Sequence, residues 1–205
     1  MRGIIYVAYG DRARAAAKLG IASLAKHHPG MPVSVIGESV DGASRIPFKG
    51  RDRYGRWAKV NVDLLSPYDP TLYLDADTVV QEDIAAGFEI VEDGWDLAII
   101  ASKNQEAQWL SHVGTDERNA TLRELGGMTL QLGGGVFWFC KNTRTERFFG
   151  LWREEWQRWS GQDQAALIRA LQRAPLKVWC MSKMWNGGDI IKHNWGHARR
   201  RERDR

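Results

Sequence analysis

The chain has 205 residues, which is enough for one domain with a sizeable hydrophobic core. Hydrophobic residues make up 43% of it and charged residues 26%, and this balance excludes an intrinsically disordered chain. The net charge is +4, but residues 199–205 alone carry five Arg against one Glu and one Asp. The body is therefore close to neutral, which argues against a non-enzymatic module that binds nucleic acid through a coherent basic face.

We expect one domain over residues 1–198 and a basic, disordered tail over residues 199–205. A contact of this tail with acidic acceptors, lipid headgroups or nucleic acid is the alternative. The apolar runs GIIYVA and DLAIIA are too short to span a membrane, and the N-terminus lacks the pattern of a signal peptide. Cys140 and Cys180 belong to no CxxC pair, so we expect reduced, buried thiols. Together these features predict a cytoplasmic protein without a transmembrane segment.

The first predicted elements are a strand, a helix and a second strand. Residues 3–9 are a continuous, β-branched apolar run, which is typical of a buried strand. Asp11 is a candidate N-cap for an Ala-rich helix over residues 12–28, and residues 31–38 form the second strand. The inward stripe of the helix consists of Ala17, Ile21, Leu24 and His28. This order predicts an α/β fold with a mixed, mostly parallel central sheet flanked by helices.

The rest of the chain continues to alternate between apolar and polar segments. A polar loop over residues 41–55 precedes a short helix over residues 56–65, whose Trp57, Val60 and Leu64 are expected to point inward. We expect further strands at residues 71–80, 96–103, 130–139 and 176–181, helices at 148–159 and 163–172, and an irregular polar segment at 104–125.

Three tryptophans in the predicted helix 148–159 stand at helical spacing. Trp152, Trp156 and Trp159 occupy positions i, i+4 and i+7, so they form one stripe. We interpret this stripe as the face that is buried on the sheet. A platform for an acceptor or a membrane is the alternative.

The most informative string runs from an apolar strand directly into two carboxylates, Asp75 and Asp77. Side chains at i and i+2 of an extended segment point to the same side, so we expect both carboxylates to converge. Converging carboxylates repel each other unless a cation lies between them or one is protonated. Ligands of open α/β sheets bind beyond the carboxyl ends of the strands, and Mg²⁺ or Mn²⁺ prefers such oxygen ligands. A capping role at the strand exit is the structural alternative.

One class of enzyme with an apolar strand followed by Asp-x-Asp is that of the haloacid-dehalogenase-like phosphatases. There the first carboxylate, here Asp75, is the nucleophile, and Asp77 would be a general acid-base. That motif normally opens the fold, whereas here a strand-helix-strand unit precedes it, and no convincing later acidic pair follows. We keep this reading as the alternative.

Further features follow a different pattern. They are the strand Ile4–Tyr9, Lys59 sixteen residues before Asp75, LYLDADTVV, the glycine strand LGGGVF, Gly161-Gln162-Asp163-Gln164, and His193-x-x-Gly196-x-x-Arg199. In this order they resemble glycosyltransferase family 8, the glycogenin and bacterial galactosyltransferase-like enzymes, over roughly residues 3–199. Gly133 stands where that family has Asn, and Gln131 is a candidate replacement. Arg199 stands where it has Lys.

The resemblance implies a GT-A fold and a metal-dependent hexosyltransferase. Such an enzyme moves a sugar from a nucleoside diphosphate sugar, here a UDP-sugar, with retention of anomeric configuration. The implied cofactor is Mn²⁺ or Mg²⁺. The acceptor stays open among a glycan, a protein, a lipid and a nucleic acid.

The resemblance also assigns roles to individual residues. Asp75, Asp77 and His193 would hold the metal, with His197 as a competitor of His193. Asp163 and Gln164 would lie beside the reacting sugar carbon. Contacts to the nucleotide sugar are assigned to Ala8, Tyr9, Lys59, Asp75, Ala76, Asp77, Gly134, Gly135, Gly196 and Arg199.

Overall fold

A computed structural model describes residues 1–49, 55–102, 110–126 and 130–194. Its centre is a seven-stranded sheet in the order β3-β2-β1-β4-β7-β6-β8. The strands are β1 (Gly3–Ala8), β2 (Val33–Gly37), β3 (Ser44–Ile46), β4 (Thr71–Leu74), β6 (Leu97–Ala101), β7 (Leu132–Phe139) and β8 (Val178–Met181). Strand β7 is antiparallel to β4 and β6, and the other neighbours are parallel. The predicted mixed, mostly parallel sheet is therefore confirmed.

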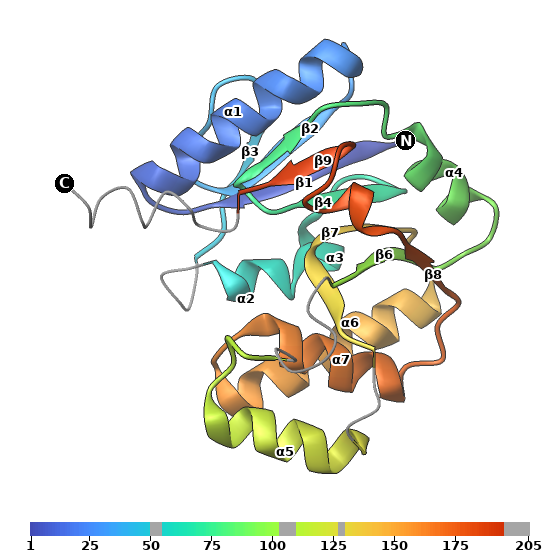
Figure 1. Ribbon diagram of the computed structural model, residues 1–205. Helices are drawn as coiled ribbons and strands as arrows, with labels where there is room; N and C mark the ends of the chain where they lie inside the picture. Colours follow the sequence, from blue (N-terminus) through green and yellow to red (C-terminus); the bar gives the residue numbers. More distant parts are fainter. Residues whose placement is uncertain (50–54, 103–109, 127–129, 195–205) are drawn as a thin grey trace.

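Helices cover both faces of this sheet (Figure 1). Helix α1 (Asp11–His27) and a two-stranded sheet of β5 (Thr78–Val80) and β9 (Ile191–His193) lie on one face. The other face packs against the elements α2 (Arg56–Lys59), α3 (Val62–Leu65), α6 (Thr143–Trp159) and α7 (Asp163–Arg173). The remaining helices are α4 (Ala85–Glu92), α5 (Thr115–Leu125), which packs outside α7, and the 3₁₀ turn η1 (Lys183–Trp185). None of the described helices combines the length and apolar character needed to cross a bilayer.

Strand β1 shows why its sequence is apolar without interruption. Ile4 and Tyr6 pack on the side of α1, whereas Ile5 and Val7 pack on the side of α6. A strand that is buried on both faces has no solvent-facing position at which polar residues would be favoured. Helix α1 completes the first core cluster with Ala17, Ile21 and Leu24, as its stripe predicts.

Helix α1 also departs from the prediction at both of its ends. Gly10, rather than Asp11, is the N-cap, and Asp11 is the first helical residue. His28 is the C-cap and lies outside the apolar stripe, because its Nε2 accepts a hydrogen bond of 3.0 Å from the backbone N–H of Ile84.

The predicted helix 56–65 is interrupted after Lys59, and the residues that follow present a different face to the core than expected. Asn61 donates a hydrogen bond of 2.7 Å from Nδ2 to the carbonyl oxygen of Trp57, and such side-chain bonds compete with helical ones. Helix α2 therefore ends at Lys59 and α3 begins at Val62. Leu64, which was expected to point inward, is 68% exposed.

Five of the described elements escaped the sequence pattern, among them η1 and β9, which follow the last predicted strand. Strand β3 lies in the segment predicted as a loop, and α4 follows β5 without having been predicted. Helix α5 occupies part of the segment 104–125 that was expected to be irregular. The helix was missed because its buried residues are polar, so no apolar periodicity marks it. The cysteines are also less buried than expected, since Cys140 is half-buried and Cys180, on the edge strand β8, is exposed.

The tryptophan stripe is mostly a core feature. Trp152 and Trp156 are buried against the sheet, and the ring of Trp152 lies 5.9 Å from that of Phe137 on β7. Trp159, at the last turn of α6, is 37% exposed. The buried interpretation is thus confirmed for the first two residues and wrong for the third.

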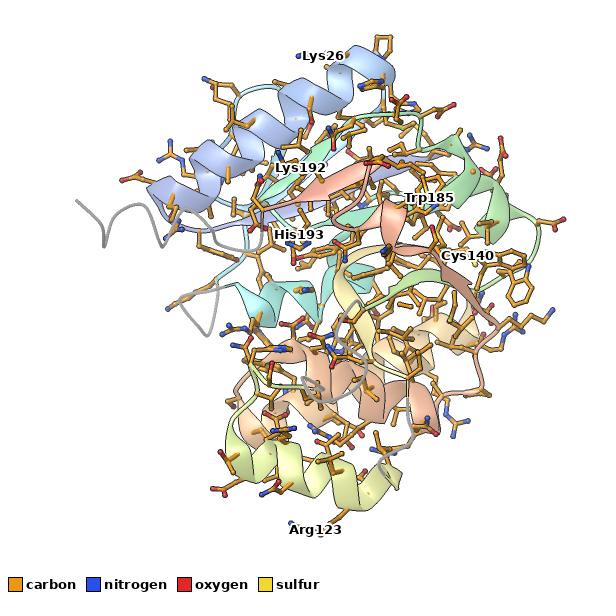
Figure 2. All side chains as sticks on the ribbon, in the orientation of Figure 1. Lys26, Arg123, Cys140, Trp185, Lys192 and His193 are labelled. Carbon is orange, nitrogen blue, oxygen red and sulfur yellow. The ribbon has the colours of Figure 1, made fainter. Side chains whose placement is uncertain are left out.

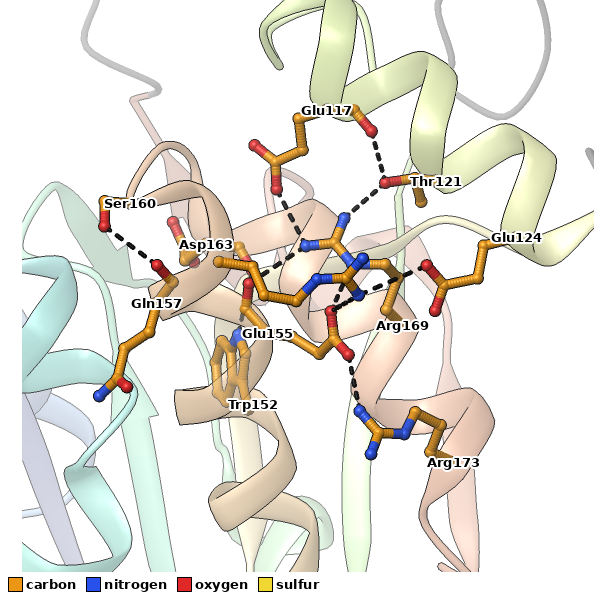
Figure 3. Close-up of polar contacts among 11 residues, drawn as sticks. Glu117, Thr121, Glu124, Trp152, Glu155, Gln157, Ser160, Asp163, Arg169 and Arg173 are labelled. Carbon is orange, nitrogen blue, oxygen red and sulfur yellow. Dashed lines mark hydrogen bonds and ion pairs between the residues drawn. The ribbon is translucent and has the colours of Figure 1, made fainter.

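A buried ionic network joins α5, α6 and α7 and is centred on Arg169 (Figure 3). Its guanidinium pairs with Glu155 at 2.8 Å and with Glu117 at 3.1 Å, and it also hydrogen-bonds Thr121. Burial alone would raise the pKa of Glu155, but hydrogen bonds from Arg169 and Arg158 hold it below its ordinary value. The network thus adds buried polar contacts to the apolar contact that Leu122 and Leu125 of α5 make with α7.

We expect Arg169→Leu to lower the free energy of unfolding by about 3–5 kcal/mol, because it leaves Glu117 buried without its arginine and removes the buried partner of Glu155. Glu155 then retains the half-exposed Arg158 and Arg173. Urea denaturation measures this change. Arg158→Ala is the matched control, since Arg158 also pairs with Glu155 but its side chain is 49% exposed. The control should cost less than about 1 kcal/mol. Equal losses in both variants would contradict a special role of the buried arginine.

Candidate active site

The two carboxylates predicted to converge do so, but through a turn rather than an extended segment. Strand β4 ends at Leu74, and the chain turns before β5 begins at Thr78. Thr78 closes the turn by donating from its backbone N–H, at 3.1 Å, and from Oγ1, at 2.8 Å, to the carbonyl oxygen of Asp75. Ala76 packs against the first core cluster and fixes the middle of the turn.

His193 joins the two carboxylates from the other end of the chain. Strand β9 pairs with β5 so that His193 lies opposite Thr78. Its Nε2 is 3.0 Å from Oδ1 of Asp77 and 3.8 Å from Oδ2 of Asp75. One ligand atom from each residue lies within 4.8 Å of the others. Figure 2 shows His193 near the middle of the molecule, whereas Lys26 and Arg123 lie at its margins.

The three consecutive glycines of β7 make room for this cluster. Because β7 is antiparallel to β4, its first residues lie beside the end of β4, and Gly135 accepts a 2.8 Å hydrogen bond from the N–H of Asp75. A Cβ at Gly135 would lie 2.6 Å from Cε1 of His193 and 2.8 Å from Oδ2 of Asp75. A Cβ at Gly134 would lie 3.3 Å from Oδ2 of Asp163. Glycine is therefore required at Gly135 by the close approach of His193 and Asp75, and a side chain at Gly134 would crowd Asp163.

The donor set suits a divalent cation. Two carboxylate oxygens and one imidazole nitrogen fit Mn²⁺ particularly well, because oxygen ligands favour hard cations and imidazole favours transition metals. The absence of a side chain at Gly135 leaves two of these groups accessible to a common ion. Asp75, Asp77 and His193 thus fit the metal that the sequence predicted.

A second charged cluster shares Asp75 with the first and surrounds the buried Lys59. Nζ of Lys59 is 2.8 Å from Oδ2 of Asp163 and 3.2 Å from Oδ1 of Asp75. Burial alone would lower the pKa of Lys59, but the two carboxylates raise it above its ordinary value, so the ammonium group stays charged. Conversely, Lys59 holds the pKa of Asp163 below its ordinary value against the effect of burial. Lys59 therefore links the candidate metal ligand Asp75 to the predicted catalytic residue Asp163.

Tyr73 completes this cluster and was not identified from the sequence. It donates from its hydroxyl to Oδ1 of Asp75 at 2.8 Å, and its ring stacks on Phe137. Burial and the charge of Asp75 raise the pKa of Tyr73 well above its ordinary value. One oxygen of Asp75 is thereby fixed by Tyr73 and Lys59, while the other faces His193. Tyr73 resembles an ordinary strand residue, so no sequence pattern indicates this role.

Asp163 and Gln164 lie at the first turn of α7, next to the glycine strand. Gln164 donates from Nε2 to the carbonyl oxygen of Leu132 at 2.8 Å, and this bond ties α7 to β7. Arg56 approaches Asp163 with Nε at 3.7 Å. Gln131, the candidate replacement for the missing Asn, is 1% exposed and is hydrogen-bonded to the backbone N–H of Leu110 and to the hydroxyl of Ser102.

Ala8 and Tyr9, which were predicted to contact the nucleotide, lie at the carboxyl end of the central strand β1. Ala8 is fully buried, and its carbonyl oxygen accepts from the N–H of Glu38 at 3.1 Å. Tyr9 is half-buried and donates from its hydroxyl to the carbonyl oxygen of Phe48 at 2.8 Å. The other predicted residues, Gly196, His197 and Arg199, lie outside the described residues together with the tail 199–205.

Asn186 is the other residue that the sequence did not reveal. It lies in the turn between η1 and β9, and its Oδ1 is 2.7 Å from Nδ1 of His193. A Cβ at Gly133 would lie 3.1 Å from Nδ2 of Asn186. A side chain from a distant segment therefore fills the space beside the glycine that stands where the family has Asn.

Comparison with known proteins identifies the class of fold. No protein-family model and no curated protein sequence matches the chain significantly. The galactosyltransferase LgtC, solved with donor and acceptor sugar analogs, has a TM-score of 0.61 and 16% identity, covering 89% of this chain and 74% of that one. The glycosyltransferase GlyE of Streptococcus pneumoniae TIGR4 has a TM-score of 0.62 and 16% identity, with coverages of 90% and 46%.

A eukaryotic structure agrees with these two. Mouse xyloside xylosyltransferase 1 has a TM-score of 0.60 and 10% identity, covering 90% of this chain and 87% of that one. At such low identity the likeness establishes the fold alone. The chain therefore has the GT-A glycosyltransferase fold that its motifs predicted, and the expected structural resemblance is confirmed.

Proposed function

We propose that this chain is a metal-dependent glycosyltransferase that moves a sugar from a UDP-sugar to an acceptor. The observation that carries the proposal is the meeting of Asp75, Asp77 and His193 from two distant segments at the end of β4. Ligands of open α/β sheets bind at this end of the strands. The fold shared with the glycosyltransferases above supports the same reading.

The charges of the site suit departure of a diphosphate. When bound, a divalent cation neutralises negative charge that develops on the leaving diphosphate. Asp75 and Asp77 hold that cation, and Tyr73 keeps Asp75 oriented. Lys59 adds a fixed positive charge in a buried position, which strengthens its electrostatic effect.

Asp163 is suited to an electrostatic role at the sugar. Its pKa lies below the ordinary value, so the carboxylate is ionised at neutral pH. An ionised carboxylate stabilises the positive charge of an oxocarbenium-like sugar. Gln164, fixed by Leu132, lies beside it on the same helix turn. We propose that this pair faces the reacting sugar carbon of the donor, with retention of configuration as the family resemblance implies.

The proposal is tested by thermal unfolding with UDP and Mn²⁺. At 100 times the dissociation constant, a ligand that binds only the folded state stabilises it by about 2.7 kcal/mol. For a domain of this size we expect the Tm to rise by about 5–10 °C. UDP with EDTA is the control and should give a much smaller shift. No shift with any nucleoside diphosphate, together with hydrolysis of a phosphate monoester, would instead favour the phosphatase that uses Asp75 as nucleophile.

A further inference from the structure

Asn186 contacts His193, one of the three candidate metal ligands, through the ring nitrogen that does not face the carboxylates. Its Oδ1 lies 2.7 Å from Nδ1 of His193, while Nε2 of the same ring faces Asp77 at 3.0 Å. The two ring nitrogens therefore have separate partners on opposite sides. Oδ1 of Asn186 faces the nitrogen that points away from the carboxylates, so it can set the orientation of the imidazole ring from the side opposite the cation site.

The chemistry of imidazole makes this contact consequential. A histidine that binds a cation through Nε2 must present a lone pair there and carry its proton on Nδ1. The Nδ1–H then needs an acceptor, and a partner at this position fixes both the tautomer and the ring orientation. The carboxamide oxygen of Asn186 is such an acceptor at hydrogen-bonding distance.

We propose that Asn186 is a positioning residue that holds His193 in the Nδ1–H tautomer and aims its Nε2 at the cation site. This inference rests on the metal-dependent function proposed above. It assigns a role to a residue that belongs to none of the sequence motifs.

The turn around Asn186 is built to hold it in place. The backbone N–H of Asn186 donates to the carbonyl oxygen of Lys183 at 3.1 Å, and Gly187 donates to Ile191 at 2.7 Å. Gly187 has a φ of 94°, a conformation that other residues rarely adopt. A Cβ at Gly188 would lie 2.4 Å from Cα of Met184, so the turn has no room for a side chain at this position. The backbone thus fixes where the carboxamide lies.

Strand β7 limits the carboxamide from the opposite side. A Cβ at Gly133 would come within 3.1 Å of Nδ2 of Asn186, which is tighter than ordinary van der Waals contact. The glycine therefore leaves just enough space for the carboxamide. Gly133→Ala should push Asn186 away from His193 and reproduce part of the effect of removing it.

The test compares the Mn²⁺ affinity of the full chain with that of its variants. The EPR signal of free Mn²⁺ measures binding, with and without UDP. A sample of UDP and Mn²⁺ without protein is the blank. We expect Asn186→Ala to weaken Mn²⁺ binding by about 10–100-fold, and Gly133→Ala to weaken it less. Asn186→Asp keeps an acceptor oxygen and should restore tight binding. Asn194→Ala is the matched control, because Asn194 adjoins His193 and its side chain takes no part in these contacts.

The tautomer itself is read by ¹⁵N NMR of histidine-labelled protein saturated with diamagnetic Mg²⁺. We expect a protonated Nδ1 for His193 in the wild type and in Asn186→Asp, and a mixture of tautomers in Asn186→Ala. Far-UV circular dichroism verifies that each variant is folded.

The outcomes separate this inference from the function on which it rests. Equal Mn²⁺ affinity of the wild type and Asn186→Ala, or an unchanged tautomer, would overturn the role of Asn186 alone. No Mn²⁺ binding by the wild type would overturn both the metal centre and this role. A wild type that binds Mn²⁺ and transfers no sugar would remove the proposed function and leave the role of Asn186 standing.

Discussion

Asp77→Asn is expected to lower the rate of metal-dependent sugar transfer by at least about 100-fold, because several kcal/mol of charge stabilisation depend on the cation. The substitution keeps the shape of the side chain and removes one of the two negative charges that face His193. The rate of UDP-sugar hydrolysis in the presence of Mn²⁺ measures the effect without knowledge of the acceptor.

The stability of the same variant makes the prediction sharper. Asp75 and Asp77 repel each other in the metal-free protein, so Asp77→Asn should unfold at the same temperature or higher when EDTA is present. The Mn²⁺-dependent rise in Tm should be lost. Asp93→Asn, an exposed carboxylate at the end of α4, is the control and should behave as the wild type. Full activity of Asp77→Asn would remove the metal assignment.

The strongly periodic parts of the fold were predictable, and the polar parts were not. Strand β1 and helix α1 carry apolar patterns that only one secondary structure satisfies, so their positions were predicted within about two residues. Helix α5 escaped because Glu117 and Thr121, its buried residues, are polar and bond to Arg169, which lies some fifty residues away. A long-range partner leaves no local pattern in the sequence.

The candidate site shows the same division. Asp75 and Asp77 were found because they follow an apolar strand, and Lys59 because its distance from Asp75 in the sequence resembles that of the glycosyltransferase family; the structure brings the three together. The route was different from the expected one, since a turn closed by Thr78 makes the carboxylates converge. Asn186 was missed because its role depends on the position of His193 in three dimensions, and nothing in an Asn-Gly-Gly turn indicates a contact with a metal ligand.

Lys59→Met should impair both the stability and the activity of the protein. Lys59 is 7% exposed and lies between Asp75 and Asp163, so its removal leaves two carboxylates without their closest positive charge. We expect the free energy of unfolding to fall by about 3–5 kcal/mol. Hydrolysis of UDP-sugar should fall by at least about 100-fold, because a fixed positive charge in a buried site is lost.

A double variant separates these two effects. Asp163→Asn in the background of Lys59→Met removes the carboxylate that has lost its closest cation and retains the more distant Arg56, with Nε at 3.7 Å, so most of the lost stability should return. The activity should not return, since neither the ammonium group nor the carboxylate is then present. Urea denaturation and UDP-sugar hydrolysis of the single and double variants measure both quantities. If the double variant were as unstable as Lys59→Met, the pair would not be coupled. The ion pair between Nζ of Lys59 and Oδ2 of Asp163, 2.8 Å apart, would then add no stability beyond that of side-chain packing.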